Sequence, residues 1–306
     1  MTDLHPYEHA LYEAANRDNR LIICTAETRY AMRNLENLLG ERFIDVGISE
    51  QTLIGMAAGL AKMGNIPICH ALANFLLMRP FEFIRTDLDY PNLSVVLVGS
   101  FAGFFSQGNG PTHQAVDDIS LMSHLPNMKI VAPANLGEMV WVIENIADNI
   151  NSPIYLRFND YTDNNLTSCN LQKIPQHWSK NYLPIKGKDT LVISYGLCFS
   201  LLLIASDQLP ANTGLLNLIF LWPLDPQFFR QLFREYKTII VVEDHRYVGG
   251  LCYHTKALAY DMQYRGRVVG LNLGDQFFQP LLLNDLLEYE GFSSSALIEK
   301  IHSVLN

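Results

Sequence analysis

The first half of the chain alternates short apolar runs with stretches in which apolar residues recur at helical spacing. The runs are apolar throughout, which is typical of parallel strands covered on both faces. We therefore expect strands at residues 21–26, 42–46, 66–72, 93–99, 128–133 and 153–158. The helical spacing predicts helices at residues 52–62, 79–87, 116–123 and 138–147. This order of strands and helices indicates a doubly wound α/β domain.

The alternation stops after residue 158, where a polar segment rich in Asn, Asp, Ser, Thr and Pro begins. A second alternation follows, with strands expected within 190–196, 213–224 and 237–244 and helices near 199–207, 226–236 and 250–260. A length of 306 residues also suits about two domains. The sequence thus predicts two α/β domains with mainly parallel sheets, residues 1–160 and 189–306, joined by a linker at 161–188.

Composition excludes several classes of protein. Hydrophobic residues make up 49% and charged residues 17% of the chain, which suits buried cores and not a disordered chain. The formal net charge is −9 without any run of Lys or Arg, so no nucleic-acid partner is expected. No apolar stretch approaches the ~20 residues that span a bilayer, and the first residues lack the pattern of a signal or transit peptide. We therefore expect a cytoplasmic protein without a membrane partner.

The candidate metal ligands and cysteines add little to this picture. His5 and His9 lie one helical turn apart, but no third ligand is near them in the sequence. A solvated helix face explains the pair more simply, and no metal site is expected. The five cysteines are scattered and odd in number, so we interpret them as reduced and mostly buried thiols.

A carboxylate opens one of the predicted helices. Residues 42–64 read as an apolar strand, a glycine turn and a helix that begins at Glu50. A carboxylate in the first turn stabilises the helix dipole, which is one explanation of Glu50. However, Ser49 could already cap this helix, and α/β folds bind ligands where a strand ends beside a helix N-terminus. Glu50 is therefore also a candidate site residue. The small residues Ala57, Ala58 and Gly59 would let a neighbouring backbone approach the same helix closely.

A second unusual stretch, residues 99–122, follows the strand expected at 93–99. It begins as a glycine-rich loop with Phe101, Phe104 and Phe105, which is too apolar for a solvated connection. The loop ends in Pro-Thr-His-Gln, which puts His113 after a strand and before a helix. His113 is either an ordinary residue at a helix start or a group for proton transfer or substrate hydrogen bonding.

Together the two stretches resemble the transketolase-like thiamine diphosphate enzymes. The likeness is carried by "DVGISEQ" and, about 60 residues later, by "GNGPTHQAVDDISLMSHLPNMKIVAPAN". It continues through "SPIYLRF" and, in the second unit, through "WPLDP" and "IIVVEDHRYVGGL", so it extends over nearly the whole chain. The resemblance implies a pyrimidine-binding domain followed by a transketolase C-terminal-like domain. It also implies transfer of a two-carbon ketol, or a related acyl unit, from a ketose or keto-acid donor to an aldehyde acceptor.

The same resemblance implies a partner. These enzymes bind the cofactor diphosphate and Mg²⁺ through a separate domain with a Gly-Asp-Gly motif, and this motif does not occur in the sequence. The chain thus resembles the C-terminal subunit of a split transketolase that is active only with a diphosphate-binding N-terminal subunit. Active sites of the family form across dimer interfaces, so a homodimer of this chain within an α2β2 heterotetramer is expected. Thiamine diphosphate would lie between the two kinds of subunit, with Mg²⁺ bound mainly by the partner.

The resemblance assigns roles to four residues of the first domain. Glu50 matches the glutamate that hydrogen-bonds N1′ of the cofactor's aminopyrimidine, and it counts as both catalytic and cofactor-binding. Phe75 matches the aromatic residue that stacks on this ring, unless it is an ordinary core phenylalanine. Leu72 lies beside it as a further cofactor-binding position. His113 would be a catalytic residue that hydrogen-bonds the donor substrate.

Four further residues are expected to meet the substrate. Arg79 and Arg157 match arginines of the family that suit a phosphate or carboxylate, although a structural salt bridge is an alternative for both. Two positions depart from the family pattern. Where transketolase subunits have His-Ala-Gly, this chain has Phe101 followed by Ala-Gly. Where they have Glu-Asp-Gly, this chain has Gly-Asn-Gly with Asn109 at the centre. We therefore expect an atypical donor, either a 2-keto acid or an unusual ketose, because sites that recognise hydroxyl groups discriminate strongly.

Two other interpretations stay open. One is a decarboxylating ketol synthase that resembles deoxyxylulose-phosphate synthase and uses a keto-acid donor. The other is a non-catalytic assembly subunit. Glu50 argues against the second, because a degenerate site has no physical need for a carboxylate at this place.

Overall fold

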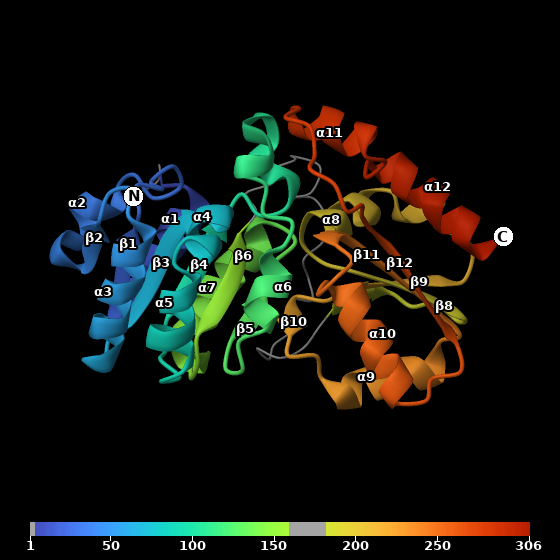
Figure 1. The fold of residues 1–306 in the computed structure, drawn as a ribbon, viewed down its shortest axis with the longest axis horizontal. Coiled ribbons are helices and arrows are strands. Elements are labelled where there is room, and N and C mark those ends of the chain that lie inside the picture. Colours follow the sequence, from blue (N-terminus) through green and yellow to red (C-terminus); the bar gives the residue numbers. More distant parts are fainter. Residues whose placement is uncertain (1–3, 159–181) are drawn as a thin grey trace.

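The computed structural model describes residues 4–158 and 182–306, which form two domains around two separate sheets (Figure 1). Each sheet lies between layers of helices, with the first domain in blue to green and the second in yellow to red. The predicted architecture of two doubly wound α/β domains is therefore confirmed.

The first sheet has seven strands in the order β10-β5-β6-β4-β3-β1-β2. Its strands are β1 (Leu21–Thr25), β2 (Phe43–Asp45), β3 (Ile66–Leu72), β4 (Val96–Ser100), β5 (Lys129–Val131), β6 (Ile154–Phe158) and β10 (Phe220–Trp222). The strands β1 to β6 run parallel to one another, so their carboxyl ends meet at one edge of the sheet. β10 belongs to the second half of the chain and pairs antiparallel with β5.

Helices cover both faces of this sheet. The helical elements are α1 (Pro6–Arg17), α2 (Leu35–Leu39), η1 (Gly40–Arg42), α3 (Glu50–Lys62), α4 (Ala73–Met78), α5 (Phe81–Phe83), η2 (Ile84–Asp89), η3 (Phe104–Thr112), α6 (Asp118–Ser123) and α7 (Leu136–Asn149). α1, α2 and α7 pack on one face and α3 to α6 on the other. Alternate residues of β4, such as Val96 and Leu97, join opposite core clusters, which explains why the strand is apolar throughout.

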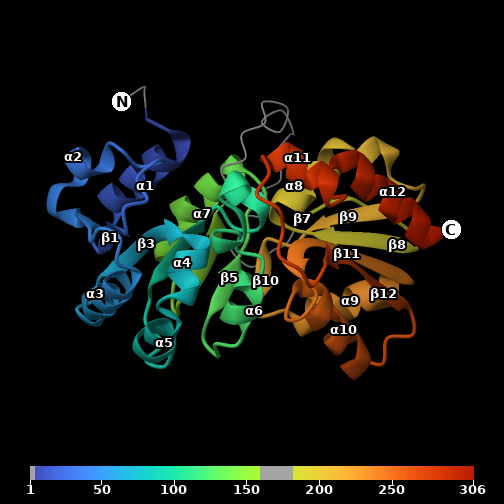
Figure 2. The same ribbon diagram turned by 45° about the horizontal axis from the view of Figure 1, so that its top comes forward.

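The second sheet has five strands in the order β12-β11-β8-β9-β7. They are β7 (Tyr182–Ile185), β8 (Thr190–Ser194), β9 (Thr213–Asn217), β11 (Thr238–Arg246) and β12 (Arg267–Leu273), with only β7 antiparallel. The helices are α8 (Gly196–Ile204), η4 (Ser206–Gln208), α9 (Pro226–Glu235), α10 (Leu251–Asp261), α11 (Leu283–Tyr289) and α12 (Ser294–Leu305). α8, α11 and α12 cover one face and α9 and α10 the other (Figure 2).

The two domains share their apolar cores. One core cluster contains Leu53 and Leu76 of the first domain together with Leu191 and Phe229 of the second. A second cluster joins Phe104 of the η3 loop to the face covered by α8 and α12. The domains are therefore packed against one another through buried apolar side chains.

The boundaries differ from the expected ones in a few places. The run at 213–224 divides between β9 in the second sheet and β10 in the first. The helix expected at 79–87 is a short α5 followed by the π-helical η2. β7 lies inside the range expected to be linker, whose residues 161–181 are outside the described residues. The helices α1, α2, α4, α11 and α12 and the strand β12 were not predicted.

In the described ranges, no helix is long and apolar enough to cross a membrane. The four cysteines in these ranges, Cys24, Cys69, Cys198 and Cys252, are free and buried, as expected from their scattered positions.

Candidate functional site

The candidate site lies where β2, β3 and β4 end. Because these strands are parallel, the segments that follow them gather at one edge of the first sheet. They are the start of α3 after β2, the turn into α4 after β3, and the η3 loop after β4. Most of the residues singled out in the sequence come from these three segments.

Glu50 is the first residue of α3, and its carboxylate is buried, with 4% of the residue exposed. The preceding Ser49 does not cap the helix with its side chain, since its Oγ hydrogen-bonds Thr52 Oγ1 at 2.6 Å. Arg79 is the cation that faces Glu50, and its Nη1 donates to both carboxylate oxygens at 3.1 Å. Glu50 is thus a buried, ion-paired carboxylate and not merely a solvated group at a helix end.

Arg79 also connects Glu50 to an aromatic pair. Its guanidinium lies over the ring of Phe75, with Cζ 3.7 Å from the ring centroid. The edge of Phe75 meets His113 at 4.8 Å between ring centroids. His113 Nδ1 lies 2.8 Å from Thr112 Oγ1, which fixes the ring at the end of η3. The structure therefore brings Glu50, Arg79, Phe75 and His113 into one connected group.

Three other predicted residues line a neighbouring pocket. Leu72, Phe101 and Asn109 surround a cavity of about 260 Å³ together with other residues of the η3 loop. The second domain closes the pocket with Leu282. None of the eight lining side chains carries a charge, so the pocket offers hydrogen bonds and apolar contacts but no ion pair.

The backbone around Phe101 has a special conformation. Phe101 has a φ of 58°, in the left-handed region that non-glycine residues seldom adopt. Its ring packs against Tyr30 at 5.1 Å between centroids. Ser106 Oγ lies 3.2 Å from the carbonyl oxygen of Phe101 and 2.8 Å from that of His113, and so ties the two ends of the loop together.

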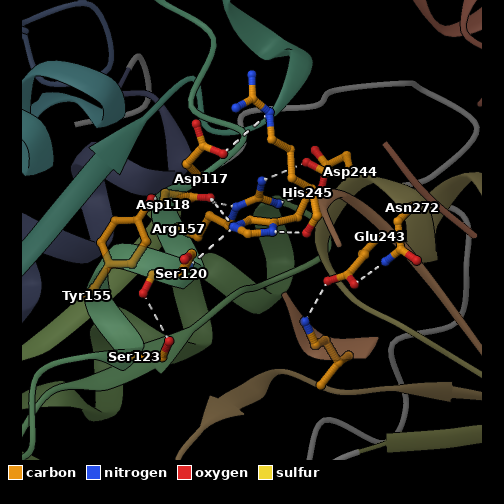
Figure 3. Close-up of polar contacts among 12 residues, drawn as sticks. Asp117, Asp118, Ser120, Ser123, Tyr155, Arg157, Glu243, Asp244, His245 and Asn272 are labelled. Atoms are coloured by element: carbon orange, nitrogen blue, oxygen red, sulfur yellow. Dashed lines mark hydrogen bonds and ion pairs between the residues drawn. The ribbon is translucent and has the colours of Figure 1, made fainter. Parts of the chain in front are cut away.

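Arg157 lies apart from this group. It is fully buried near the end of β6, and its guanidinium pairs with two carboxylates (Figure 3). Its Nε donates to Asp118 Oδ2 at 2.8 Å and its Nη1 to Asp244 Oδ1 at 2.7 Å. Burial by itself would lower the pKa of Arg157, but the charges of Asp118 and Asp244 outweigh it and raise the pKa. This geometry corresponds to the salt-bridge alternative and not to an arginine that faces a substrate.

The pair of aspartates holds both ends of the loop that carries His113. Asp118 begins α6, directly after the loop, and also accepts a hydrogen bond from Tyr155 at 2.7 Å. Asp244 comes from β11 of the second domain and lies against Gly103, at the start of the loop. Burial raises the pKa of the Asp244 carboxyl, and Arg157 opposes this rise. One arginine thus connects the loop's two ends to the second domain.

Two more buried groups of β11 complete this interface (Figure 3). His245 Nε2 accepts the N–H of Ser120 at 3.3 Å, and its Nδ1 donates to the Arg246 carbonyl oxygen at 2.6 Å. Glu243 receives the N–H groups of Leu251 and Cys252 at the start of α10. Burial raises the pKa of the Glu243 carboxyl.

Sequence reasoning did not single out Asp118, Asp244 or His245. Their signal is present in "AVDDIS" and "VVEDHR", where charged residues adjoin apolar runs at the expected start of a helix and end of a strand. Burial of such charges requires partners. In the part of the chain that is described, no group of three or more His, Cys, Asp and Glu side chains could hold a metal ion.

Comparison with known families matches both halves of the chain. The transketolase pyrimidine-binding domain matches residues 5–160, and the transketolase C-terminal domain matches residues 181–297.

Individual relatives fall into two groups by length. A 1-deoxy-D-xylulose-5-phosphate synthase of Clostridium tetani is 29% identical over 97% of this chain, which spans only 48% of that protein. A protein of Methanocaldococcus jannaschii described as a transketolase C-terminal section is 27% identical over 96% of this chain, which spans 93% of it. Among solved structures, a split-gene transketolase in an inactive β4 tetramer superimposes with a TM-score of 0.82 at 24% identity, covering 98% of this chain and 96% of that one.

Proposed function

This chain belongs to the transketolase family, and we propose that it supplies the pyrimidine-binding half of a thiamine diphosphate-dependent active site. In this proposal a second chain supplies the diphosphate-binding half, and the complex transfers a two-carbon unit from a ketose or keto-acid donor to an aldehyde. The observation that carries the proposal is the buried Glu50 carboxylate, which lies in one group with Arg79, Phe75 and His113.

The hydrogen-bonding groups of the site fit the cofactor's aminopyrimidine. A carboxylate offers about four acceptor positions, of which Arg79 uses one on each oxygen of Glu50. The remaining positions can accept an N–H from a ring that lies against Phe75 and Leu72. When bound, thiamine diphosphate supplies the nucleophilic carbon that takes up and passes on the two-carbon fragment.

The residues of this chain would orient the ring and the substrate. Glu50 holds the pyrimidine by a hydrogen bond that is stronger in a dry interface than in water. Arg79 holds the carboxylate in place by donating to both of its oxygens. His113 hydrogen-bonds the donor beside the reacting centre, with its ring held by Phe75 and Thr112.

The proposed partner is a diphosphate-binding chain of the same family. The absence of a Gly-Asp-Gly motif from the sequence supports it, because the family uses that motif for the diphosphate and Mg²⁺. A curated relative and a solved structure that this chain spans almost completely also support a partner chain. We propose an α2β2 complex in which Mg²⁺ belongs mainly to the partner.

The uncharged pocket at the η3 loop indicates which kind of donor substrate the complex uses. Phe101 and Asn109 present a ring and an amide where transketolase subunits have a histidine and a carboxylic acid, and none of the described residues that line the cavity is a cation. We therefore propose a donor whose pocket-bound part is uncharged, either a 2-keto acid with a small apolar group or an unusual ketose. The keto-acid donor corresponds to the decarboxylating ketol synthase, and the loss of the histidine favours this second candidate.

The central test uses the complex reconstituted with its diphosphate-binding partner. Glu50→Gln should lower kcat by at least a hundredfold, because the amide keeps the shape but loses the charge. Glu82→Gln is the matched control, since Glu82 is another carboxylate near a helix start but is exposed. Equal activity of Glu50→Gln and the unmodified complex would contradict a catalytic role and favour the assembly subunit.

The donor proposal has its own test. The reconstituted complex is assayed with xylulose 5-phosphate and with a series of 2-keto acids, each with the same aldehyde acceptor. We expect low kcat/KM for xylulose 5-phosphate, and we expect Phe101→His to raise it. Efficient turnover of xylulose 5-phosphate by the unmodified complex would overturn the proposed donor without affecting the role of Glu50.

A further inference from the structure

A second pocket lies at the other end of the second sheet, away from the candidate site. It has a volume of about 550 Å³ and is formed where α9 ends and where β11 and β12 begin. It therefore lies at the opposite end of β11 from Asp244, which contacts the η3 loop. Its volume is within the range of about 300–1,000 Å³ that small-molecule sites usually have.

The pocket gathers positive charge on an acidic protein. Four of its nine lining residues are Arg234, Lys237, Arg265 and Arg267, although the whole chain carries a net charge of −9. Lys237 pairs with Asp189 at 2.7 Å, and Arg267 donates to the carbonyl oxygen of Val304. Arg234 and Arg265 make no ion pair with any described residue. Two guanidinium groups are thus free to bind an anion.

A flat aromatic surface lies beside these cations. The rings of Phe233 and Tyr264 are stacked, with centroids 4.6 Å apart and planes inclined by 25°. Tyr264 is anchored by its hydroxyl, which donates to the carbonyl oxygen of Tyr236 at 3.0 Å. A Cβ at Gly266 would lie 2.3 Å from the Tyr264 ring, so only glycine allows the chain to pass this close. The aromatic surface is therefore preformed.

Compensation of a helix dipole explains only part of this arrangement. A cation in the last turn of α9 is favourable for the helix, and Arg234 stands there. Arg265 lies beyond the end of α10, and neither helix requires the stacked rings beside it. The combination of free guanidinium groups with an aromatic surface points to a ligand that has both a planar ring and phosphates.

We propose that this pocket binds a nucleotide, with its base against Tyr264 and Phe233 and its phosphates between Arg234 and Arg265. Guanidinium groups bind phosphate oxygens through paired N–H donors, and they also stack well beside aromatic rings. A purine ring is also stabilised by packing on an aromatic side chain. The site is separate from the proposed catalytic group, and its occupation would couple to that group through β11 and Asp244.

Isothermal titration calorimetry of the full chain tests the proposal, with ATP as the probe and without thiamine diphosphate. We expect one ATP to bind per chain, and we expect adenosine and tripolyphosphate each to bind at least tenfold more weakly than ATP. Arg265→Ala and Tyr264→Leu should each weaken ATP binding by tenfold or more. Arg85→Ala is the matched control, because Arg85 is an exposed arginine of the first domain that pairs only with Glu82.

Four outcomes would overturn the proposal. They are no binding of ATP at millimolar concentration, unchanged affinity in Arg265→Ala, tripolyphosphate binding as tightly as ATP, and loss of ATP binding in Phe75→Ala. The third outcome would leave only an unselective anion site, and the fourth would assign the nucleotide to the catalytic group. Circular dichroism and the thermal midpoint of each variant verify its fold, and Arg234→Ala provides a second variant if Tyr264→Leu unfolds.

Discussion

Gly103 and Asp244 are in contact across the two domains, so closely that a Cβ on Gly103 would lie 1.8 Å from Asp244 Oδ2. Gly103 begins the loop that carries His113, and Asp244 lies near the end of β11 in the second domain. The contact depends on a glycine with a φ of 60°, because any side chain would displace the aspartate. The second domain thereby fixes where the loop starts.

Gly103→Ala should destabilise the chain by about 2–5 kcal/mol, since it combines a left-handed backbone cost of about 1–2 kcal/mol with overpacking of about 1–3 kcal/mol. Gly108→Ala in the same loop is the matched control. Its φ is not in the left-handed region and no atom lies within 4 Å of its Cβ position, so the change should stay within ~0.5 kcal/mol. Urea denaturation measures both variants, and similar losses for the two would refute the close contact.

Arg157→Ala should cost about 3–5 kcal/mol of stability, because it leaves the buried carboxylates of Asp118 and Asp244 without their cation. Arg85→Ala, which breaks an exposed ion pair with Glu82, should leave the stability almost unchanged. Loss of Arg157 removes the group that opposes the raised pKa of Asp244. The deficit of Arg157→Ala should therefore shrink as pH falls and Asp244 becomes protonated, and a deficit that is constant from pH 7 to pH 4 would contradict this explanation.

Arg79→Gln should lower the activity of the reconstituted complex by tenfold or more while the thermal midpoint stays nearly constant. The side chain of Arg79 is 42% exposed, so it contributes little to folding, but it is the cation that faces Glu50 and covers Phe75. Arg85→Gln, a few residues further along the chain, should leave activity unchanged. A thermal midpoint that falls together with the activity would indicate a structural role instead.

Glu138 should make stability depend on pH near neutrality. Burial raises the pKa of this carboxyl to about 7, although Ala134 N and Asn217 Nδ2 donate to its oxygens. The pKa of Glu138 in the folded state lies above the ordinary value of 4.5. The contribution of its protonated carboxyl to stability is therefore fully present below pH 4.5 and is lost as pH rises through 7. The total change is on the order of 3 kcal/mol.

Glu138→Gln removes the titrating proton while an amide still meets Ala134 and Asn217. Urea denaturation from pH 5 to 8 should show that the stability of the unmodified chain, relative to that of this variant, falls as pH rises towards 7. Burial lowers the pKa of His70 to about 4 and gives an opposite trend at lower pH, but this contribution is common to both proteins and cancels in the comparison. Parallel profiles would assign the pH dependence to other groups.

The sequence predicted the elements whose pattern is local. β3 runs over the expected residues, and Glu50, Phe75, Arg79 and His113 could be grouped because they lie in motifs at strand ends. The resemblance to the transketolase family is confirmed by both domain matches. α1 was missed because its buried residues include Ala10 and Ala14, which weigh little in an apolar pattern.

The interactions that the sequence did not reveal are long-range. Arg157 was expected at the substrate, yet its partners are 39 and 87 residues away along the chain, and the more distant one belongs to the other domain. A sequence shows that an arginine is present but not which carboxylates the fold brings to it. The close approach of a neighbouring backbone expected at Ala57, Ala58 and Gly59 is also modified by the fold. Ala57 and Ala58 pack in the chain's own core, whereas Gly59 is exposed.

The strand β10 joins the two domains into a single structural unit. It is encoded in the second half of the gene but completes the edge of the first sheet beside β5. A fragment that ended after β6 would expose this edge, whose unpaired N–H and C=O groups are a template for aggregation. The complementary fragment would carry a strand with no sheet to join. Separating the two domains would therefore leave unpaired strand edges in both fragments, so we expect them to fold only together.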